Sequence, residues 1–277
     1  MLLDLVGLLF ELRCDEETRD RLTREWPEFL ARESERAPDV IVDARRVEAL
    51  AEPVDSIEVI AERAGSDWRF MRRDFDLLWS PSRRTAKVSF RRGFSLTAAL
   101  RTLLTMALRT AQGVLLHASS VRVGDEAVVF PGVSGTGKTT IAELGAPRGV
   151  LSDEITGVRI HGEAVVVHPT PFWGDMPRTR AADSAPLRAL VFLERGGPPS
   201  IGPADPASVI ATLLETVLLF NAQAASRDDK AEVVRLLTNI AMRSRCRRLI
   251  YALPANPWAL LDDSTACVSA QATTAAS

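Results

Sequence analysis

Gly132-Val-Ser-Gly-Thr-Gly-Lys-Thr-Thr140 is the stretch that decides the fold of this 277-residue chain. It has the G-x-x-x-x-G-K-[S/T] spacing of a phosphate-binding loop, follows the apolar run Ala127–Phe130 and precedes a predicted helix. Its glycines let the backbone curl so that several N–H groups point into one concavity, where the positive end of the helix also favours an anion. The pattern therefore predicts a P-loop that binds a nucleoside triphosphate.

Two side chains of this loop have specific predicted roles. Lys138 is expected to reach the β- and γ-phosphates of ATP, and Thr139 is expected to offer its hydroxyl group to Mg²⁺. Lysine is scarce in this chain, since Lys87 and Lys230 are the only others. The residues predicted to bind the nucleotide are Gly132, Val133, Ser134, Gly135, Thr136, Gly137, Lys138, Thr139 and Thr140.

An acidic pair, Asp153-Glu154, follows the short predicted strand Val150–Ser152. In parallel α/β sheets the carboxyl ends of strands face the crevice that also holds the phosphate loop. Carboxylate oxygens suit Mg²⁺, so Asp153 and Glu154 are predicted metal ligands together with Thr139. Asp153 is also the predicted catalytic carboxylate, because one of the pair can accept a proton from an attacking hydroxyl group.

Other polar residues are weaker candidates. His117 is predicted on a strand that pairs with the strand before the loop, and both a core role and a catalytic role beside Asp153 and Lys138 remain open. His161 and His168 have no partner at metal-ligand spacing and are predicted to be structural. Glu194 also ends an apolar run, but it ranks below Asp153 because the following Arg195-Gly-Gly-Pro-Pro indicates a surface turn.

Composition narrows the class of protein. A formal net charge of −2 favours no nucleic-acid partner. The apolar start, Met1–Phe10, is too short to span a bilayer and lacks a basic leader, so no membrane partner is expected. Three cysteines without paired spacing favour reduced thiols, and the predicted location is cytoplasmic.

The elements around the loop predict an α/β fold. A small α+β unit over residues 1–94 is a candidate for acceptor recognition, a P-loop domain covers 95–263, and 264–277 form a loose tail.

Local patterns predict several elements of this fold. Single strands are expected over residues 2–13 and 68–75, and a helix capped by Asp15 over 16–32. Ser95 is expected to cap a second helix over 96–111.

His117-Ala-Ser, the loop Gly132–Thr140 and Leu151-Ser-Asp-Glu154 together resemble the HPr kinase/phosphorylase family. The chain looks most like the smaller HPr-kinase-like proteins of peptide and lasso peptide biosynthesis clusters. The resemblance implies a domain like the core of phosphoenolpyruvate carboxykinase and phosphoryl transfer to serine. It also implies that Asp153 is the base, that Glu154 is associated with magnesium and that His117 is the histidine before the loop.

Two details limit what the resemblance implies. The Glu-Ile-Arg-Gly type signature that the HPr enzymes use for phosphorolysis is missing, so that reverse reaction is not predicted. Arg178 and Arg180 are weak candidates for contacting a transferring phosphoryl group.

The predicted function is an ATP- and Mg²⁺-dependent kinase that phosphorylates a hydroxyl group, foremost of serine, on a peptide or small protein. One alternative is a kinase of small-molecule hydroxyl groups. Another is a nucleotide-binding regulatory protein without transfer activity. The oligomeric state stays open, a homo-oligomer included.

Overall fold

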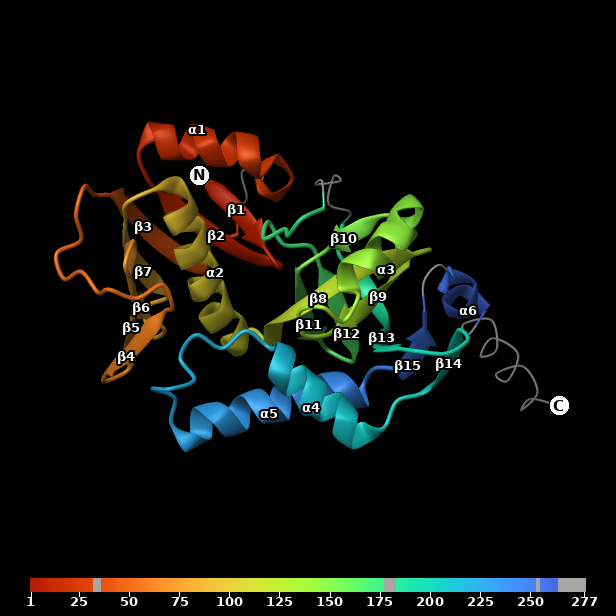
Figure 1. Cartoon of the computed structure of the whole chain (residues 1–277). Coiled ribbons are helices and arrows are strands. Elements are labelled where there is room, and N and C mark those ends of the chain that lie inside the picture. Colours follow the sequence, from red (N-terminus) through yellow and green to blue (C-terminus); the bar gives the residue numbers. More distant parts are fainter. Residues whose placement is uncertain (32–35, 177–182, 253–254, 264–277) are drawn as a thin grey trace. The chain divides into compact units, whose positions relative to one another are not determined.

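The computed structural model describes residues 1–31, 36–176, 183–252 and 255–263 (Figure 1). Within these ranges the chain is a mixed α/β protein with two sheets and six α-helices. The strands are β1 (Leu2–Leu5), β2 (Leu8–Arg13), β3 (Val40–Arg46), β4 (Ile60–Ala64), β5 (Asp67–Arg72), β6 (Phe75–Ser80), β7 (Thr85–Phe90), β8 (Gly113–Val123), β9 (Glu126–Pro131), β10 (Val150–Ser152), β11 (Ile155–His161), β12 (Ala164–His168), β13 (Ala185–Arg195), β14 (Ser200–Pro203) and β15 (Cys246–Tyr251). The helices are α1 (Glu16–Glu25), α2 (Gly93–Thr110), α3 (Lys138–Gly145), α4 (Pro206–Thr216), α5 (Arg227–Met242) and α6 (Trp258–Asp263), with 3-10 turns η1 (Pro27–Phe29) and η2 (Ala146–Arg148).

The chain divides into two compact units. The first contains Met1–Leu115, Thr170–Phe172 and Leu218–Leu236, and the second contains Leu116–Pro169, Trp173–Val217 and the described residues from Leu237 onward. These units reflect contacts alone, so the predicted boundary at residue 94 stays a prediction, and the predicted tail lies outside the described residues. None of the helices in the described ranges is long and apolar enough to cross a membrane.

The first unit is built on a seven-stranded sheet in the order β1-β2-β3-β7-β6-β5-β4. Strands β2, β3 and β7 run parallel, and the other neighbours are antiparallel. Helix α2 packs on β6 and β7 and buries the apolar stripe that its sequence predicts (Figure 1). This unit contains no part of the phosphate loop.

Two strand predictions in the first unit are wrong because the turns lack the usual signals. Residues 2–13 form a hairpin, β1 and β2, whose turn places Val6 at φ 58° and Gly7 at φ 72°. Valine is strongly disfavoured at positive φ, so a valine at this position does not predict a turn. Residues 68–75 likewise span β5, a turn at Arg73-Asp74 and the start of β6.

Two helix predictions also need correction. Asp15 caps α1 as predicted, accepting a hydrogen bond from the Thr18 N–H, but the helix ends at Glu25 because Pro27 disfavours helical geometry before it. Helix α2 begins at Gly93, with Arg92 rather than Ser95 as its N-cap. The Ser95 hydroxyl instead donates to the Asp74 carboxylate at 2.8 Å.

The second unit carries an eight-stranded sheet that positions the phosphate loop. Its order is β10-β8-β11-β12-β13-β15-β14, and β9 pairs with both β8 and β13. Strands β9 and β10 are each antiparallel to β8, so they run in the same direction. Strand β13 is parallel to β9 and to β15. The carboxyl ends of β9, β10, β13 and β15 therefore lie at one edge of the sheet.

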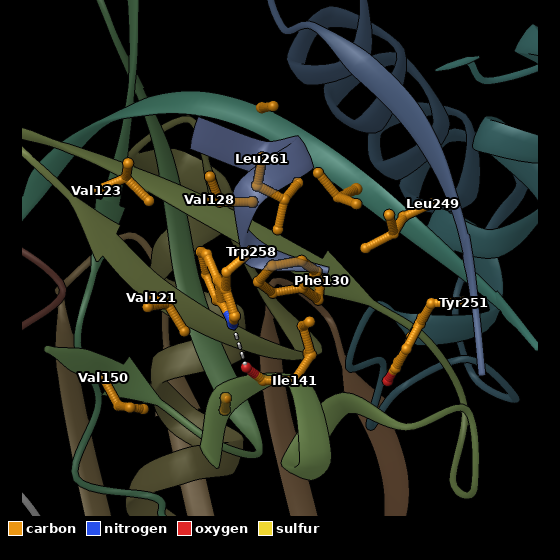
Figure 2. Close-up of a cluster of buried hydrophobic side chains, with 13 residues drawn as sticks. Val121, Val123, Val128, Phe130, Ile141, Val150, Leu249, Tyr251, Trp258 and Leu261 are labelled. Atoms are coloured by element: carbon orange, nitrogen blue, oxygen red, sulfur yellow. Dashed lines mark hydrogen bonds between the residues drawn. The ribbon is translucent and has the colours of Figure 1, made fainter. Parts of the chain in front are cut away.

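A buried apolar cluster fills the second unit behind the loop (Figure 2). Trp258 of α6 lies edge-on to Phe130 of β9, with ring centroids 5.7 Å apart. Its indole N–H donates to the backbone oxygen of Ile141 in α3 at 3.1 Å. Gly145, at the end of α3, leaves room for this ring, because a Cβ there would lie 2.4 Å from the Trp258 Cζ2 atom. Helix α6 thus supports the helix that follows the loop.

His168 is a buried histidine at the end of β12, and it makes folding depend on pH. Its side chain is 8% exposed, and burial, with the charges of Arg159 and His161, lowers the pKa of His168 from 6.5 to about 4. The unfolded chain then binds a proton that the folded chain does not, so stability is full above pH 6.5 and falls toward pH 4. The loss is expected to be on the order of 3 kcal/mol.

Urea titrations from pH 7.5 to pH 4 check this expectation. The His168→Gln variant should show a flatter dependence of unfolding free energy on pH over that window. His161→Gln should flatten this dependence less, because the His161 side chain is exposed and its charge is the smallest of the causes that lower the pKa of His168. An identical pH slope in the wild type and His168→Gln would contradict the expectation.

Candidate functional site: a phosphate loop facing a carboxylate wall

A cavity of about 540 Å³ opens at the edge where the four strands of the second unit end. Strand β9 leads into the loop, and β10 leads to Asp153 and Glu154. Strand β13 ends at Arg195. The residues lining the cavity are His117, Ser134, Gly135, Gly137, Lys138, Thr139, Thr140, Asp153, Glu154, Trp173, Gly174, Asp175 and Arg195. The fold therefore brings nine of the predicted site residues to one cavity.

The loop depends on glycine at position 137, where it enters α3. Gly137 has φ 100° and forms the N-cap of α3 without a side-chain cap. A Cβ at this position would lie 2.9 Å from the Tyr251 hydroxyl oxygen, and that hydroxyl donates to the Gly137 backbone oxygen at 3.4 Å. The first N–H groups of a helix have no partner within the helix, so α3 presents them to the cavity.

Gly132, Val133 and Thr136 support the loop without lining the cavity. The Thr136 hydroxyl donates to the Val133 backbone oxygen at 2.9 Å. A Cβ on Gly132 would lie 2.5 Å from the Thr136 hydroxyl oxygen, so any larger residue would push this contact apart. These residues shape the backbone that the other loop residues use.

Lys138 is nearly buried at the base of the loop, with 6% of the residue exposed. Its Nζ atom donates to the Val133 backbone oxygen at 2.9 Å. Burial lowers the pKa of Lys138 below its usual value, while the nearby Glu154 carboxylate acts in the opposite direction. A phosphate group in the cavity would supply an anionic partner that the Val133 oxygen cannot match.

His117 lines the cavity from β8, beside the start of the loop. Its backbone oxygen accepts a hydrogen bond from the Gly132 N–H at 3.3 Å, which ties β8 to the loop. Burial, helped by the charge of Lys138, holds the pKa of His117 below 6.5. Both effects favour the neutral ring, which can accept a hydrogen bond from a ligand.

Asp153 lines the cavity after the end of β10 and is 2% exposed. Its Oδ1 atom accepts a hydrogen bond from the Gly174 N–H, and its Oδ2 atom accepts one from the Met176 N–H, both at 2.9 Å. Glu154 is half-buried, and its backbone oxygen accepts the Ala118 N–H at 2.9 Å. The two neighbouring acids thus have different surroundings.

The carboxylates suit a metal that binds with the nucleotide better than one held by protein alone. Among residues 1–31, 36–176, 183–252 and 255–263, no three His, Cys, Asp or Glu side chains are placed to hold a metal together. Mg²⁺ in nucleotide sites commonly takes one or two carboxylates and completes its shell with phosphates and water. The donor set of Thr139 and Glu154 fits that arrangement.

Sequence reasoning missed Trp173, Asp175 and Arg195 as cavity residues. Arg195 was interpreted as part of a surface turn, yet it ends β13, whose parallel pairing with β9 and β15 brings it to the loop. Trp173 carries a buried indole N–H that meets no acceptor in the described part of the chain. A ligand oxygen in the cavity would satisfy this donor.

Three further candidates from the sequence are Glu194, Arg178 and Arg180. Glu194, the competing acid, does not line the cavity, and its carboxylate pairs with Arg248 at 3.3 Å on the surface. Arg178 and Arg180 lie outside the described residues.

These features define a glycine-rich loop and an acidic pair at one cavity of a mixed α/β protein. The family of SynChlorMet cassette protein ScmC matches residues 91–256, which is more than half of the chain. The chain belongs to this family. No curated protein matches it.

The resemblance to the HPr kinase/phosphorylase family is therefore wrong, because the family match is to ScmC. The motifs that suggested it are short and follow the requirements of phosphate binding. Unrelated families meet those requirements with the same residue types.

Proposed function

We propose that the chain binds ATP with Mg²⁺ at the loop Gly132–Thr140 and transfers the γ-phosphoryl group to a hydroxyl group of a peptide or small protein, foremost a serine. One observation carries the proposal: a glycine-rich loop with Lys138 and a carboxylate pair line a single cavity of about 540 Å³. A module that only binds phosphate needs the loop, but it has no need of acids facing it.

Lys138 and the N–H groups at the start of α3 hold the phosphates in this proposal. The Lys138 ammonium group exchanges its hydrogen bond with the Val133 oxygen for one with a phosphate oxygen. Asp153, which lines the same cavity, orients the acceptor hydroxyl group and takes its proton. Mg²⁺ bound with the nucleotide neutralises phosphate charge, and Thr139 and Glu154 are the residues that would hold it.

The test is label transfer from γ-labelled ATP with Mg²⁺. The wild-type chain is incubated with peptides encoded by neighbouring genes, because the family is described as a cassette protein. Label on a serine of one peptide is the expected result. Nucleotide binding without transfer to any of these peptides would contradict the proposal.

A nucleotide-binding protein without transfer activity is the second candidate. It is favoured by the hydrogen bonds that tie both oxygens of Asp153 to the backbone, because a carboxylate held in this way is less free to turn toward an acceptor. The same experiment separates the two candidates. Both would bind the nucleotide, but only the kinase would transfer label to a peptide.

A further inference from the structure

Arg195 lines the cavity together with Lys138, and the proposed function gives it no role. Its side chain is exposed. Among the residues that the structure describes, no carboxylate forms an ion pair with this guanidinium group. A permanent cation beside a glycine-rich loop is therefore available to a ligand.

Strand β13 carries Arg195 to the level of the loop. Strands β9 and β13 run parallel, and Val129 of β9 pairs with Leu190 of β13. Strand β9 ends at Pro131, whereas β13 continues to Arg195. Because each strand residue adds about 3.3 Å, Arg195 lies roughly 10 Å beyond the level of Pro131. The last residues of β13 thus lie beside the loop rather than beside a strand.

The pairing of β13 with β15 shows to which face of the sheet Arg195 points. Arg195 pairs with Tyr251, and directly paired residues project from the same face. The Tyr251 hydroxyl reaches the loop, where it donates to the Gly137 backbone oxygen at 3.4 Å. Glu194 projects from the other face, where its carboxylate pairs with Arg248 at 3.3 Å. Arg195 therefore projects from the face that carries the loop.

The order of the strands places the loop between Arg195 and the acidic pair. Strand β8 pairs with both β10 and β9 at Ser120 and Val121, so these two strands lie on its two edges. Strand β13 pairs with β9. The neighbours across this part of the sheet are thus β10, β8, β9 and β13. The loop follows β9, the acidic pair follows β10, and Arg195 ends β13.

We infer that Arg195 is a phosphate-binding residue that holds the triphosphate chain of the nucleotide together with Lys138. The inference rests on the nucleotide binding of the proposed function. Lys138 is nearly buried at the base of the loop, whereas Arg195 is exposed beside it. A guanidinium group presents a planar fork of donors that matches two phosphate oxygens at once. The carboxylates that line the same cavity disfavour an acidic peptide as its partner.

Titration of the full chain with two probes, a fluorescent ATP analogue and inorganic tripolyphosphate, tests this role in the presence of Mg²⁺. Arg195→Met keeps a long unbranched side chain but removes the charge and the donors. The affinity for both probes is expected to fall roughly 10- to 100-fold. Tripolyphosphate has no base or ribose, so a parallel loss assigns the effect to the phosphates. Wild-type affinity of Arg195→Met for tripolyphosphate would overturn the inference.

Arg248→Met is the matched control, because Arg248 is an exposed arginine on the neighbouring strand and pairs with Glu194 on the other face. It should leave both affinities unchanged. Arg195→Lys keeps the charge without the fork and should lose less affinity than Arg195→Met. Urea unfolding should be the same in the wild type and Arg195→Met. A loss of stability that accounts for the loss of affinity would mean a structural role and would overturn the inference.

The inference and the proposed function can fail separately. A wild type that binds both probes but transfers no label overturns the proposed transfer, and the titrations still decide the role of Arg195. Label transfer by the wild type, with unchanged affinities in Arg195→Met, overturns the inference alone. A wild type that binds neither probe overturns both.

Discussion

Replacing Lys138 with alanine is expected to lower phosphoryl transfer at least about 10³-fold and to weaken nucleotide binding in parallel. Lys138 is the one lysine at the cavity, and it is held at the base of the loop by its bond to the Val133 oxygen. Under the proposed function its ammonium group would meet the negative charge of the phosphates, in a nearly buried site where water screens it little. Alanine supplies neither the charge nor the donor.

The measurement pairs label transfer with titration of a fluorescent ATP analogue. Lys87→Ala is the matched control, because Lys87 is an exposed lysine on β7 and should leave both quantities unchanged. Circular dichroism of each variant checks that the fold persists. Wild-type binding and transfer in Lys138→Ala would mean that the loop does not hold the phosphates, and the proposed function would fail.

Replacing Trp258 with alanine is expected to lower the free energy of unfolding by about 3–5 kcal/mol. Trp258 is 1% exposed, and its ring contacts Phe130. The guanidinium carbon of Arg148 lies over the same ring, 4.8 Å from its centroid. Alanine would leave a cavity between α6, β9 and α3 and would also leave the Ile141 oxygen without its indole donor. Because α3 begins with Lys138, nucleotide affinity should decline as well.

Trp258→Phe separates the two contributions in urea unfolding experiments. Phenylalanine keeps most of the apolar contact but has no N–H, so it should lose less stability than alanine, on the order of 1–3 kcal/mol. Equal stability of the wild type and Trp258→Ala would contradict the packing of α6 on the loop helix. A loss in Trp258→Phe as large as in Trp258→Ala would assign the effect to the hydrogen bond.

The family match shows where motif reasoning reached its limit. Glycine spacing, a lysine and an acidic pair follow from the chemistry of phosphate and magnesium, so they identify a type of site. They do not identify a family, and the ScmC match over residues 91–256 rests on a much longer stretch of sequence.

The strand, glycine-rich loop and helix around Lys138 could be predicted from the sequence, because every requirement for that arrangement is local. Strand β9, the glycines of the loop and the start of α3 are consecutive along the chain, and the short helix ends at Gly145, where η2 follows it. The acidic pair was found for the same reason, since its distance from the loop along the chain is short. Helix α2 and the Asp15 cap likewise depend on periodicity and on neighbouring residues.

Only the tertiary structure decided what surrounds the loop. Arg195 and Tyr251 reach it because β13 pairs with β9 and β15 in parallel, and such pairings join segments far apart in the sequence. Asp153 and Glu154 are adjacent and chemically alike, yet Asp153 is buried and accepts the Gly174 and Met176 N–H groups, while Glu154 is half-buried. Sequence neighbours share composition, whereas burial and hydrogen bonding depend on which distant backbone folds against them.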